Sequence, residues 1–207
     1  MDFSQEVTLR NMILMVNRTN IRCDIEKAKK EAYHLLKISK ISSVTELLKL
    51  SGYQINLVHR KGIKDPHLRL KDGVCALEPN KKIFEHDFTE FNDNFKHTYL
   101  YQIYCTLQKT TNNRVGRFRL MWLNPKNCYS FHEDSNEPER FHLGLETNPY
   151  CFFLYTNAFN VYTSYHIPCN GYIYSVNAGK MHTFLNGGKT TRLHLLITLM
   201  DSKYAVL

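Results

Sequence analysis

The stretch from residue 171 to residue 199 reads GYIYSVNAGKMHTFLNGGKTTRLHLLITL. Runs rich in β-branched, aromatic and leucine residues alternate here with breaks that contain Asn and Gly, which is the pattern of short strands joined by turns. The same rhythm begins near residue 114. It predicts eight strands, at residues 116–123, 128–131, 140–147, 151–156, 160–165, 171–177, 182–185 and 190–199. Strands at this spacing predict an antiparallel β-sandwich or barrel.

The first half of the chain has a different character. Apolar residues recur at helical spacing over residues 24–37, with Asp24 as the expected N-cap, and residues 96–110 are also typical of a helix. Ser43 to Glu46 forms a capping box that predicts another helix over residues 43–50, and residues 53–58 and 74–77 are expected to be extended. We therefore predict one globular unit of the α+β class, mostly β, in which a helical and mixed region (1–110) packs on a β core (111–207).

The composition limits the classes of protein to which the chain can belong. At 207 residues with 43% hydrophobic residues, it suits one globular domain. It contains neither a run of about 20 apolar residues nor a signal peptide, so we expect a soluble cytoplasmic protein without a membrane partner. The net charge of +8 is spread along the chain without a nucleic-acid-binding motif. We interpret it as a solvated surface and a pocket for small anions, and expect no nucleic-acid partner.

Six cysteines are scattered along the chain with no CxxC pair. A domain of this length does not need disulfides, and these spacings do not suit a structural zinc site. The cysteines are expected to be free thiols.

Two histidines and one carboxylate carry the chemical signal. In an extended segment, residues two apart share a face, so His132 and Asp134 can both point at one metal ion, with His182 from a later strand. Two histidines and a carboxylate with open positions beside them are the usual setting of non-haem Fe(II) oxygen chemistry. The turn at residues 186–188 can bring Arg192 back to about the level of His182, where its planar guanidinium suits a carboxylate.

Alternation in residues 140–145 supports an anion-binding cavity. Arg140, His142 and Gly144 share one face of this strand, whereas the other face is apolar. The alternative is a polar outer face on a half-exposed strand. His194 shares the face of Arg192, where it either lines the site or, as we favour, has a structural role.

The ordered set of motifs resembles the aspartyl/asparaginyl β-hydroxylase family of Fe(II)/2-oxoglutarate-dependent dioxygenases, which includes bacterial proline hydroxylases. The likeness covers residues 116–201. Its segments are Gly116 to Met121, Pro125, Arg140 to Leu145, Gly171 to His182, Asn186 to Gly188 and Arg192 to Leu195. Two features depart from the common pattern. Pro125-Lys126 stands where the family has Pro-Gly, and Asp134 resembles the bacterial members because the animal enzymes lack this acidic ligand.

The resemblance implies a double-stranded β-helix (jelly-roll, cupin-like) core with the N-terminal helices packed on it. It implies an iron site of His132, Asp134 and His182, with Arg192 on the distal carboxylate of the co-substrate 2-oxoglutarate and His142 and Arg140 nearby. The expected reaction uses O2 to hydroxylate an Asp, Asn or Pro side chain, free or in a peptide or protein. Two alternatives stay open: a non-oxygenase cupin-type metal-dependent isomerase or small-molecule binding protein, and a basic interaction module with an inactive barrel. The oligomeric state is left open.

Overall fold

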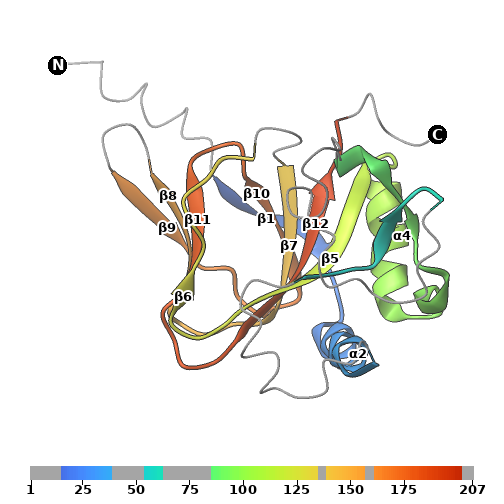
Figure 1. The fold of residues 1–207 in the computed structure, drawn as a ribbon, viewed down its shortest axis with the longest axis horizontal. Coiled ribbons are helices and arrows are strands. Elements are labelled where there is room, and N and C mark those ends of the chain that lie inside the picture. The colour runs from blue at the N-terminus through green and yellow to red at the C-terminus, as the bar shows by residue number, and fades with distance from the viewer. Residues whose placement is uncertain (1–14, 39–53, 63–84, 135–138, 157–160, 202–207) are drawn as a thin grey trace.

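The structure, a computed structural model, describes residues 15–38, 54–62, 85–134, 139–156 and 161–201. These residues form three layers: a small β-sheet, a larger β-sheet and two helices (Figure 1). The larger sheet lies in the middle, so one of its faces meets the small sheet and the other meets the helices. The chemistry of the two faces differs, and that difference positions the site.

The strands form three sheets. The larger sheet has the order β1 (Val16–Arg22), β10 (Tyr172–Asn177), β7 (Glu139–Glu146), β12 (Arg192–Leu199), β5 (Val115–Leu123) and β2 (Gln54–Asn56). The smaller sheet has the order β6 (Asn127–Cys128), β11 (His182–Asn186), β8 (Cys151–Thr156) and β9 (Tyr162–Tyr165). A separate pair consists of β3 (Val58–Arg60) and β4 (Phe88–Phe91).

The eight strands from β5 to β12 pair as one long folded hairpin. The first pairs with the last, β5 with β12, and the next pairs are β6 with β11, β7 with β10 and β8 with β9, all antiparallel. Winding such a hairpin into two facing sheets gives the jelly roll, or double-stranded β-helix. The predicted fold class is therefore confirmed, and each of the eight predicted strands is present with its ends shifted by a few residues.

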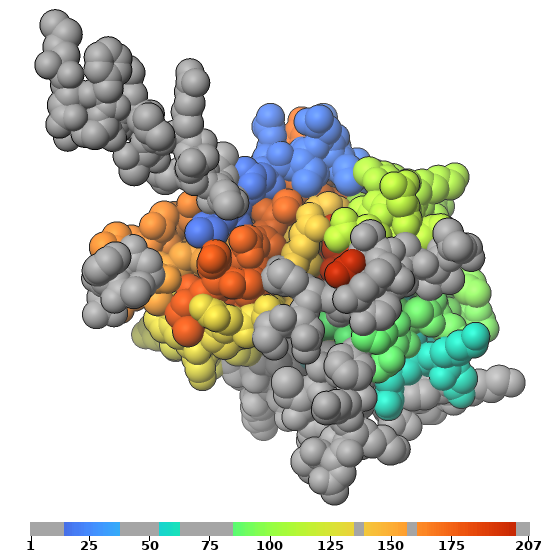
Figure 2. Space-filling model, turned by 90° about the horizontal axis from the view of Figure 1, so that it is seen from above, coloured from blue at the N-terminus to red at the C-terminus, as the bar shows by residue number. Residues whose placement is uncertain are grey.

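The N-terminal half contributes a strand to each edge of the larger sheet. β1 pairs with β10, with Val16 opposite Val176, and β2 pairs with β5. On the molecular surface, blue residues from the beginning of the chain adjoin the orange strands (Figure 2). β1 was not predicted from the sequence, because its mixture of Asn, Arg and Thr shows no clear alternation. The division of the chain at residue 110 stays a prediction.

Both described helices were predicted. α2 (Ile25–Ile38) begins after Asp24, whose Oδ1 accepts a hydrogen bond from the amide of Lys27 at 3.0 Å, as expected of an N-cap. α4 (Tyr99–Thr110) begins three residues later than predicted, because Thr98 caps it and a 3₁₀ helix, η2 (Asp93–Phe95), precedes it. The apolar face of α2 packs against the larger sheet through Ala28, Ala32, Leu35 and Leu36.

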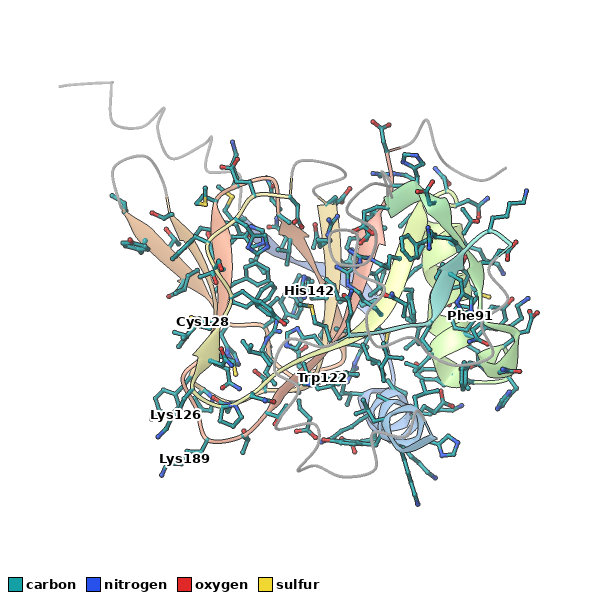
Figure 3. The ribbon with its side chains drawn as sticks, viewed as in Figure 1. Phe91, Trp122, Lys126, Cys128, His142 and Lys189 are labelled. Atoms are coloured by element: carbon teal, nitrogen blue, oxygen red, sulfur yellow. The ribbon has the colours of Figure 1, made fainter. Side chains whose placement is uncertain are left out.

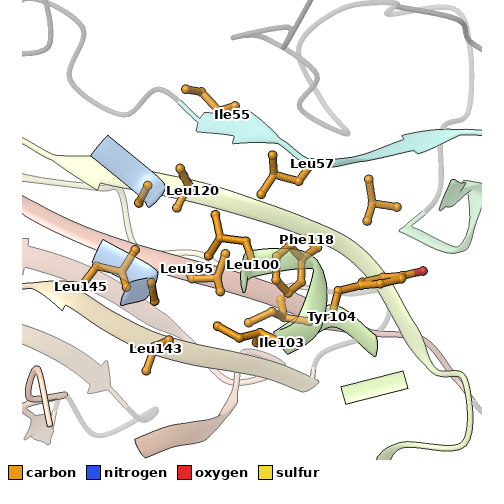
Figure 4. Packing of buried hydrophobic residues seen from close by; sticks show 14 of the residues in the cluster. Ile55, Leu57, Leu100, Ile103, Tyr104, Phe118, Leu120, Leu143, Leu145 and Leu195 are labelled. Carbon is orange, nitrogen blue, oxygen red and sulfur yellow. The ribbon is translucent and has the colours of Figure 1, made fainter. Parts of the chain in front are cut away.

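The main hydrophobic core lies between the helices and the outer face of the larger sheet. Leu143 and Leu145 of β7 point into it, together with Leu195 of β12 and Phe118 of β5 (Figure 4). The alternate residues of the same strands point the other way, toward the smaller sheet. A second, smaller core on that side contains Phe153, Tyr155 and Phe184. The predicted alternation of β7 is thus confirmed.

Several expectations lie outside the described residues, namely the helix at 43–50, the extended segment at 74–77 and the thiol of Cys75. The five cysteines that the structure describes are free thiols, as predicted: Cys23, Cys105, Cys128, Cys151 and Cys169. In the described part of the chain, no helix has the length and apolar character needed to cross a membrane.

Candidate functional site

His132 and His182, which are distant in the sequence, are neighbours in the fold. Their backbones exchange two hydrogen bonds, with N···O distances of 3.0 and 2.9 Å, where the segment after β6 runs beside the start of β11. Their ring centroids lie 4.5 Å apart. The structure therefore brings both predicted histidines to one place.

The backbone determines which ring nitrogen of each histidine can bind a ligand. Nδ1 of His132 lies 2.8 Å from the carbonyl oxygen of Ser130, and Nδ1 of His182 lies 2.8 Å from that of Lys180. A carbonyl can only accept, so Nδ1 carries the proton and Nε2 keeps its lone pair. Burial, with a contribution from the nearby His132, lowers the pKa of His182. Its imidazole is therefore neutral at pH 7, which is the form that binds metals.

Asp134 lies beside this pair. Its Oδ1 is 3.9 Å from Nε2 of His132, while its Oδ2 forms an ion pair with Arg140 at 3.0 Å. In the described part of the chain, no three His, Cys, Asp or Glu side chains converge as a metal site. The donor types nevertheless fit the set that non-haem Fe(II) uses, and both imidazoles are in the required tautomer. The assignment of His132, Asp134 and His182 as metal ligands remains a prediction. Their donor types and the tautomers of the two histidines are consistent with it.

These three side chains line one end of a cavity between the two sheets. Its volume is about 110 Å³, and its wall also includes Arg119 and Met121 from β5, Arg140 and His142 from β7, and Phe184 from β11. The His132 side chain is 44% exposed, so this end is open to solvent. At about 30 Å³ per water molecule, a cavity of this volume holds on the order of four waters, so it can take only a small ligand.

Several buried polar atoms of the cavity wall have no hydrogen-bond partner among the described residues. His142 projects from β7 into the space between the sheets (Figure 3) and is 1% exposed. Among the described residues, neither of its ring nitrogens has a hydrogen-bond partner, and the Tyr129 hydroxyl also lacks one. Burial, and the nearby Arg192, Arg119 and Arg140, lower the pKa of His142 well below its usual value. It is neutral and offers one donor and one acceptor to a ligand.

Arg140 and His142 therefore have the place that the sequence predicted. Arg140 is 4% exposed, which excludes the alternative of a polar outer face. Gly144, in contrast, does not line the cavity. A Cβ atom at this position would lie 2.9 Å from the carbonyl oxygen of Pro168, so the small residue is required by backbone packing.

The structure does not place Arg192 on the cavity wall. Its guanidinium carbon lies 4.3 Å from the ring centroid of Phe184, and Nη2 is 2.9 Å from Nδ1 of His194. The turn at residues 186–188 leads from one sheet to the other, so Arg192 meets Phe184 rather than His182. Phe184 itself lines the cavity, and Arg192 stands directly behind it. His194, which we expected to be structural, is buried and holds Arg192.

A buried cluster of charges at the cavity wall was missed. Glu85, in the 3₁₀ helix η1 (Glu85–Asp87), forms two hydrogen bonds with Arg117 of β5, one of them 3.0 Å long. Its Oε1 also lies 3.8 Å from Arg119 and 3.7 Å from Arg140. The alternation of Arg117 and Arg119 along β5 was a visible signal, but nothing in the sequence connects them to Glu85.

The turn between β5 and β6 contains Lys126, which stands where the resembling pattern has a glycine. Lys126 has a φ of +55°, in the left-handed region that favours glycine. It lies with Lys189 at the end of the barrel away from the helices (Figure 3). Lys126 therefore adopts a backbone conformation that favours glycine, at the position where the resembling pattern has one.

No protein-family model matches the chain, and no curated protein matches it in sequence. Among solved structures, it is similar to a Pseudomonas putida prolyl-4-hydroxylase, with 12% identity, a TM-score of 0.47 and coverage of 95% of this chain and 97% of that one. A 2OG-Fe(II) oxygenase-family oxidoreductase from Burkholderia pseudomallei matches at 11% identity and a TM-score of 0.36, over 41% of each chain. A cupin domain from Bordetella pertussis matches at 14% identity and a TM-score of 0.31, over 41% of this chain and 81% of that one. Likenesses this distant do not decide an activity.

Proposed function

We propose that this protein is an Fe(II)- and 2-oxoglutarate-dependent dioxygenase that hydroxylates an Asp, Asn or Pro side chain, free or within a peptide or protein. The observation that carries the proposal is the backbone pairing of His132 with His182. Both histidines contact carbonyl oxygens through Nδ1, so their Nε2 atoms are available as metal ligands, with Asp134 nearby. The narrower resemblance to the aspartyl/asparaginyl β-hydroxylases belongs to the same proposal.

His132, Asp134 and His182 would hold the metal. When bound, ferrous iron with 2-oxoglutarate and O2 supplies the oxidant for hydroxylation, and the co-substrate leaves as succinate and CO2. The carbonyls of Ser130 and Lys180 keep both imidazoles oriented with Nε2 as the donor atom. These backbone contacts prepare the site before any ligand arrives.

The remaining polar groups would bind the co-substrate. Arg140 supplies a permanent positive charge next to the ligand set, and neutral His142 supplies a hydrogen bond to a carboxylate or keto oxygen. Arg192 would hold the far carboxylate, which requires the Phe184 ring to move from its guanidinium. Apolar side chains such as Phe153 and Leu196 exclude water from the rest of the cavity.

Metal and co-substrate binding test this proposal directly. Wild-type protein with Mn(II) is expected to gain thermal stability when 2-oxoglutarate is added, because a ligand that binds only the folded state stabilises it. With Fe(II), O2 and a panel of amino acids and peptides, it should release succinate and give a product heavier by one oxygen atom. Stabilisation by Mn(II) but not by 2-oxoglutarate would favour the cupin-type alternative. Stabilisation by neither would favour the inactive module.

Matched variants locate the site. His182→Ala and Asp134→Ala should abolish succinate release, and near-normal turnover in either would show that the ligand assignment is wrong. His166→Ala is the control, because Nδ1 of His166 also meets a backbone carbonyl, that of Cys151 at 2.9 Å, but the ring is not on the cavity wall. Arg192→Gln should raise the 2-oxoglutarate concentration required by about 10- to 100-fold, the effect of losing a charged hydrogen bond.

A further inference from the structure

Arg119 is a second buried arginine on the cavity wall, and the proposed chemistry does not use it. It projects from β5, lines the cavity and is 6% exposed. Among the described residues, its Nε and Nη1 atoms have no hydrogen-bond partner. Buried donors of a charged group are rarely left unpaired, so this arrangement indicates a missing anionic partner.

The neighbouring carboxylates are already occupied. Glu85 is bonded to Arg117 through both of its oxygens, and its Oε1 lies 3.8 Å from Nη1 of Arg119, beyond hydrogen-bond distance. Oδ2 of Asp134 forms an ion pair with Arg140. Glu85 therefore contributes attraction to Arg119 at a distance but leaves its donors available.

The strand register separates Arg119 from Arg192. Arg119 stands opposite Leu196 of β12, and Leu196 stands opposite His142 of β7, so the three lie side by side across the sheet. Arg192 pairs with Leu123, four residues further along β5. At about 3.3 Å per residue, the two arginines are roughly 13 Å apart along the strands. A single carboxylate group therefore cannot contact both arginines.

We propose that Arg119 binds a carboxylate of the substrate and thereby selects an acid over the corresponding amide. This inference rests on the proposed function, because it assigns Arg140, His142 and Arg192 to the co-substrate. Arg119 stands level with His142, two residues along β7 from Arg140, which pairs with the proposed metal ligand Asp134. A carboxylate at Arg119 would therefore lie close to the proposed metal ligands. The carboxylate can come from an Asp side chain or from the α-carboxyl group of a free amino acid. Both present the same planar anion to the guanidinium.

Two pairs of probes distinguish these sources. Protein loaded with Mn(II) and 2-oxoglutarate, which does not turn over, is titrated with L-proline against L-prolinamide, and with a doubly capped aspartate against the capped asparagine. Calorimetry or thermal shift measures binding. One acid is expected to bind while its amide does not. Equal binding of acid and amide, or no binding of either acid, overturns the proposal.

Variants then assign the selectivity to Arg119. Arg119→Gln should weaken binding of the preferred acid by about 10- to 100-fold and leave 2-oxoglutarate binding unchanged, while Arg119→Lys retains part of the affinity. Arg114→Gln is the control, since Arg114 is only half-buried, pairs with Glu139 and lies outside the cavity. Arg192→Gln should show the opposite pattern, with 2-oxoglutarate binding weakened by about 10- to 100-fold and binding of the acid unchanged. If Arg119→Gln weakens 2-oxoglutarate binding as strongly, Arg119 belongs to the co-substrate and the inference fails.

A failure of the proposed function is distinguishable from a failure of this inference. If wild-type protein does not bind 2-oxoglutarate, the dioxygenase proposal is wrong. The acid and amide probes are then compared on protein with Mn(II) alone, where acid selectivity that disappears in Arg119→Gln still supports the anionic site. Arg119→Gln also removes the attraction between Arg119 and Glu85, whose Oε1 lies 3.8 Å away, so a lower melting temperature is expected for this variant. Arg119→Lys keeps the charge, and the binding of both variants is measured below their melting temperatures.

Discussion

Replacing Glu85 with Gln should lower the free energy of unfolding by about 3 kcal/mol at pH 7. Glu85 is 4% exposed, and burial alone raises its pKa. Arg117, Arg119 and Arg140 outweigh burial and lower the pKa from 4.5 to about 2. That difference corresponds to about 3 kcal/mol of preferential stabilisation of the charged form in the folded state. Removing one partner from a buried ion pair has a cost of the same size.

The effect of this substitution should depend on pH in a defined direction. A carboxyl group whose folded pKa is depressed stabilises the protein fully above its unfolded pKa, and the contribution is lost as the pH falls toward the folded pKa. The difference between wild type and Glu85→Gln should therefore be constant above about pH 6 and shrink as the pH falls through 4.5. By about pH 3 more than half of it should be gone, because protonated Glu and Gln are nearly isosteric and both are neutral.

Urea unfolding of both proteins between pH 3 and pH 7 measures this difference, since other carboxyl groups titrate equally in the two. Glu139→Gln is the matched control. Glu139 also pairs with an arginine, Arg114, at 3.2 Å, but its side chain is 43% exposed, so its removal should cost less than about 1 kcal/mol. The reasoning is refuted if Glu85→Gln destabilises no more than Glu139→Gln, or if its effect does not change with pH.

Three further substitutions are checked by urea unfolding. His142→Leu should leave stability unchanged or raise it by up to about 1 kcal/mol, since it removes two buried nitrogens without partners, while 2-oxoglutarate titration shows weaker binding; a large loss of stability would contradict this. Lys126→Gly should stabilise by about 1 kcal/mol because it relieves a left-handed backbone, and no gain would contradict it. Gly144→Ala should destabilise by about 1–3 kcal/mol because its Cβ meets the Pro168 carbonyl, and a neutral result would contradict it.

The spacing of short β-rich runs between turn residues was sufficient to predict an antiparallel sandwich or barrel, and the alternation within the runs predicted the strand faces. In β7, period-two patterning placed Leu143 and Leu145 in the core and Arg140 and His142 on the opposite face, and the structure confirms both placements. Turn residues gave the strand ends, because Asn, Gly and Pro interrupt each run. Local sequence therefore carried the information on strands and on which face each residue occupies.

Contacts between distant segments could not be predicted in the same way. The pairing of Glu85 with Arg117 joins a 3₁₀ helix outside the barrel to its first strand, and no local pattern specifies that contact. The position of Arg192 depends on how the turn after β11 passes between sheets. Sequence spacing suggested that this arginine would return to the level of His182, whereas the crossing places it against Phe184.

The polar inner face of the larger sheet is difficult to explain by folding alone. The outer face of the same strands already forms an apolar core with both helices, so the fold has its driving force without the inner arginines. Arginines and histidines in a buried cavity reduce stability unless every donor is paired, and Arg119 and His142 keep unpaired nitrogens. Well-packed apolar residues of similar volume would be expected to give a more stable barrel. Local violations of this kind are typical of functional sites, so the unpaired groups themselves argue that this cavity binds an anionic ligand.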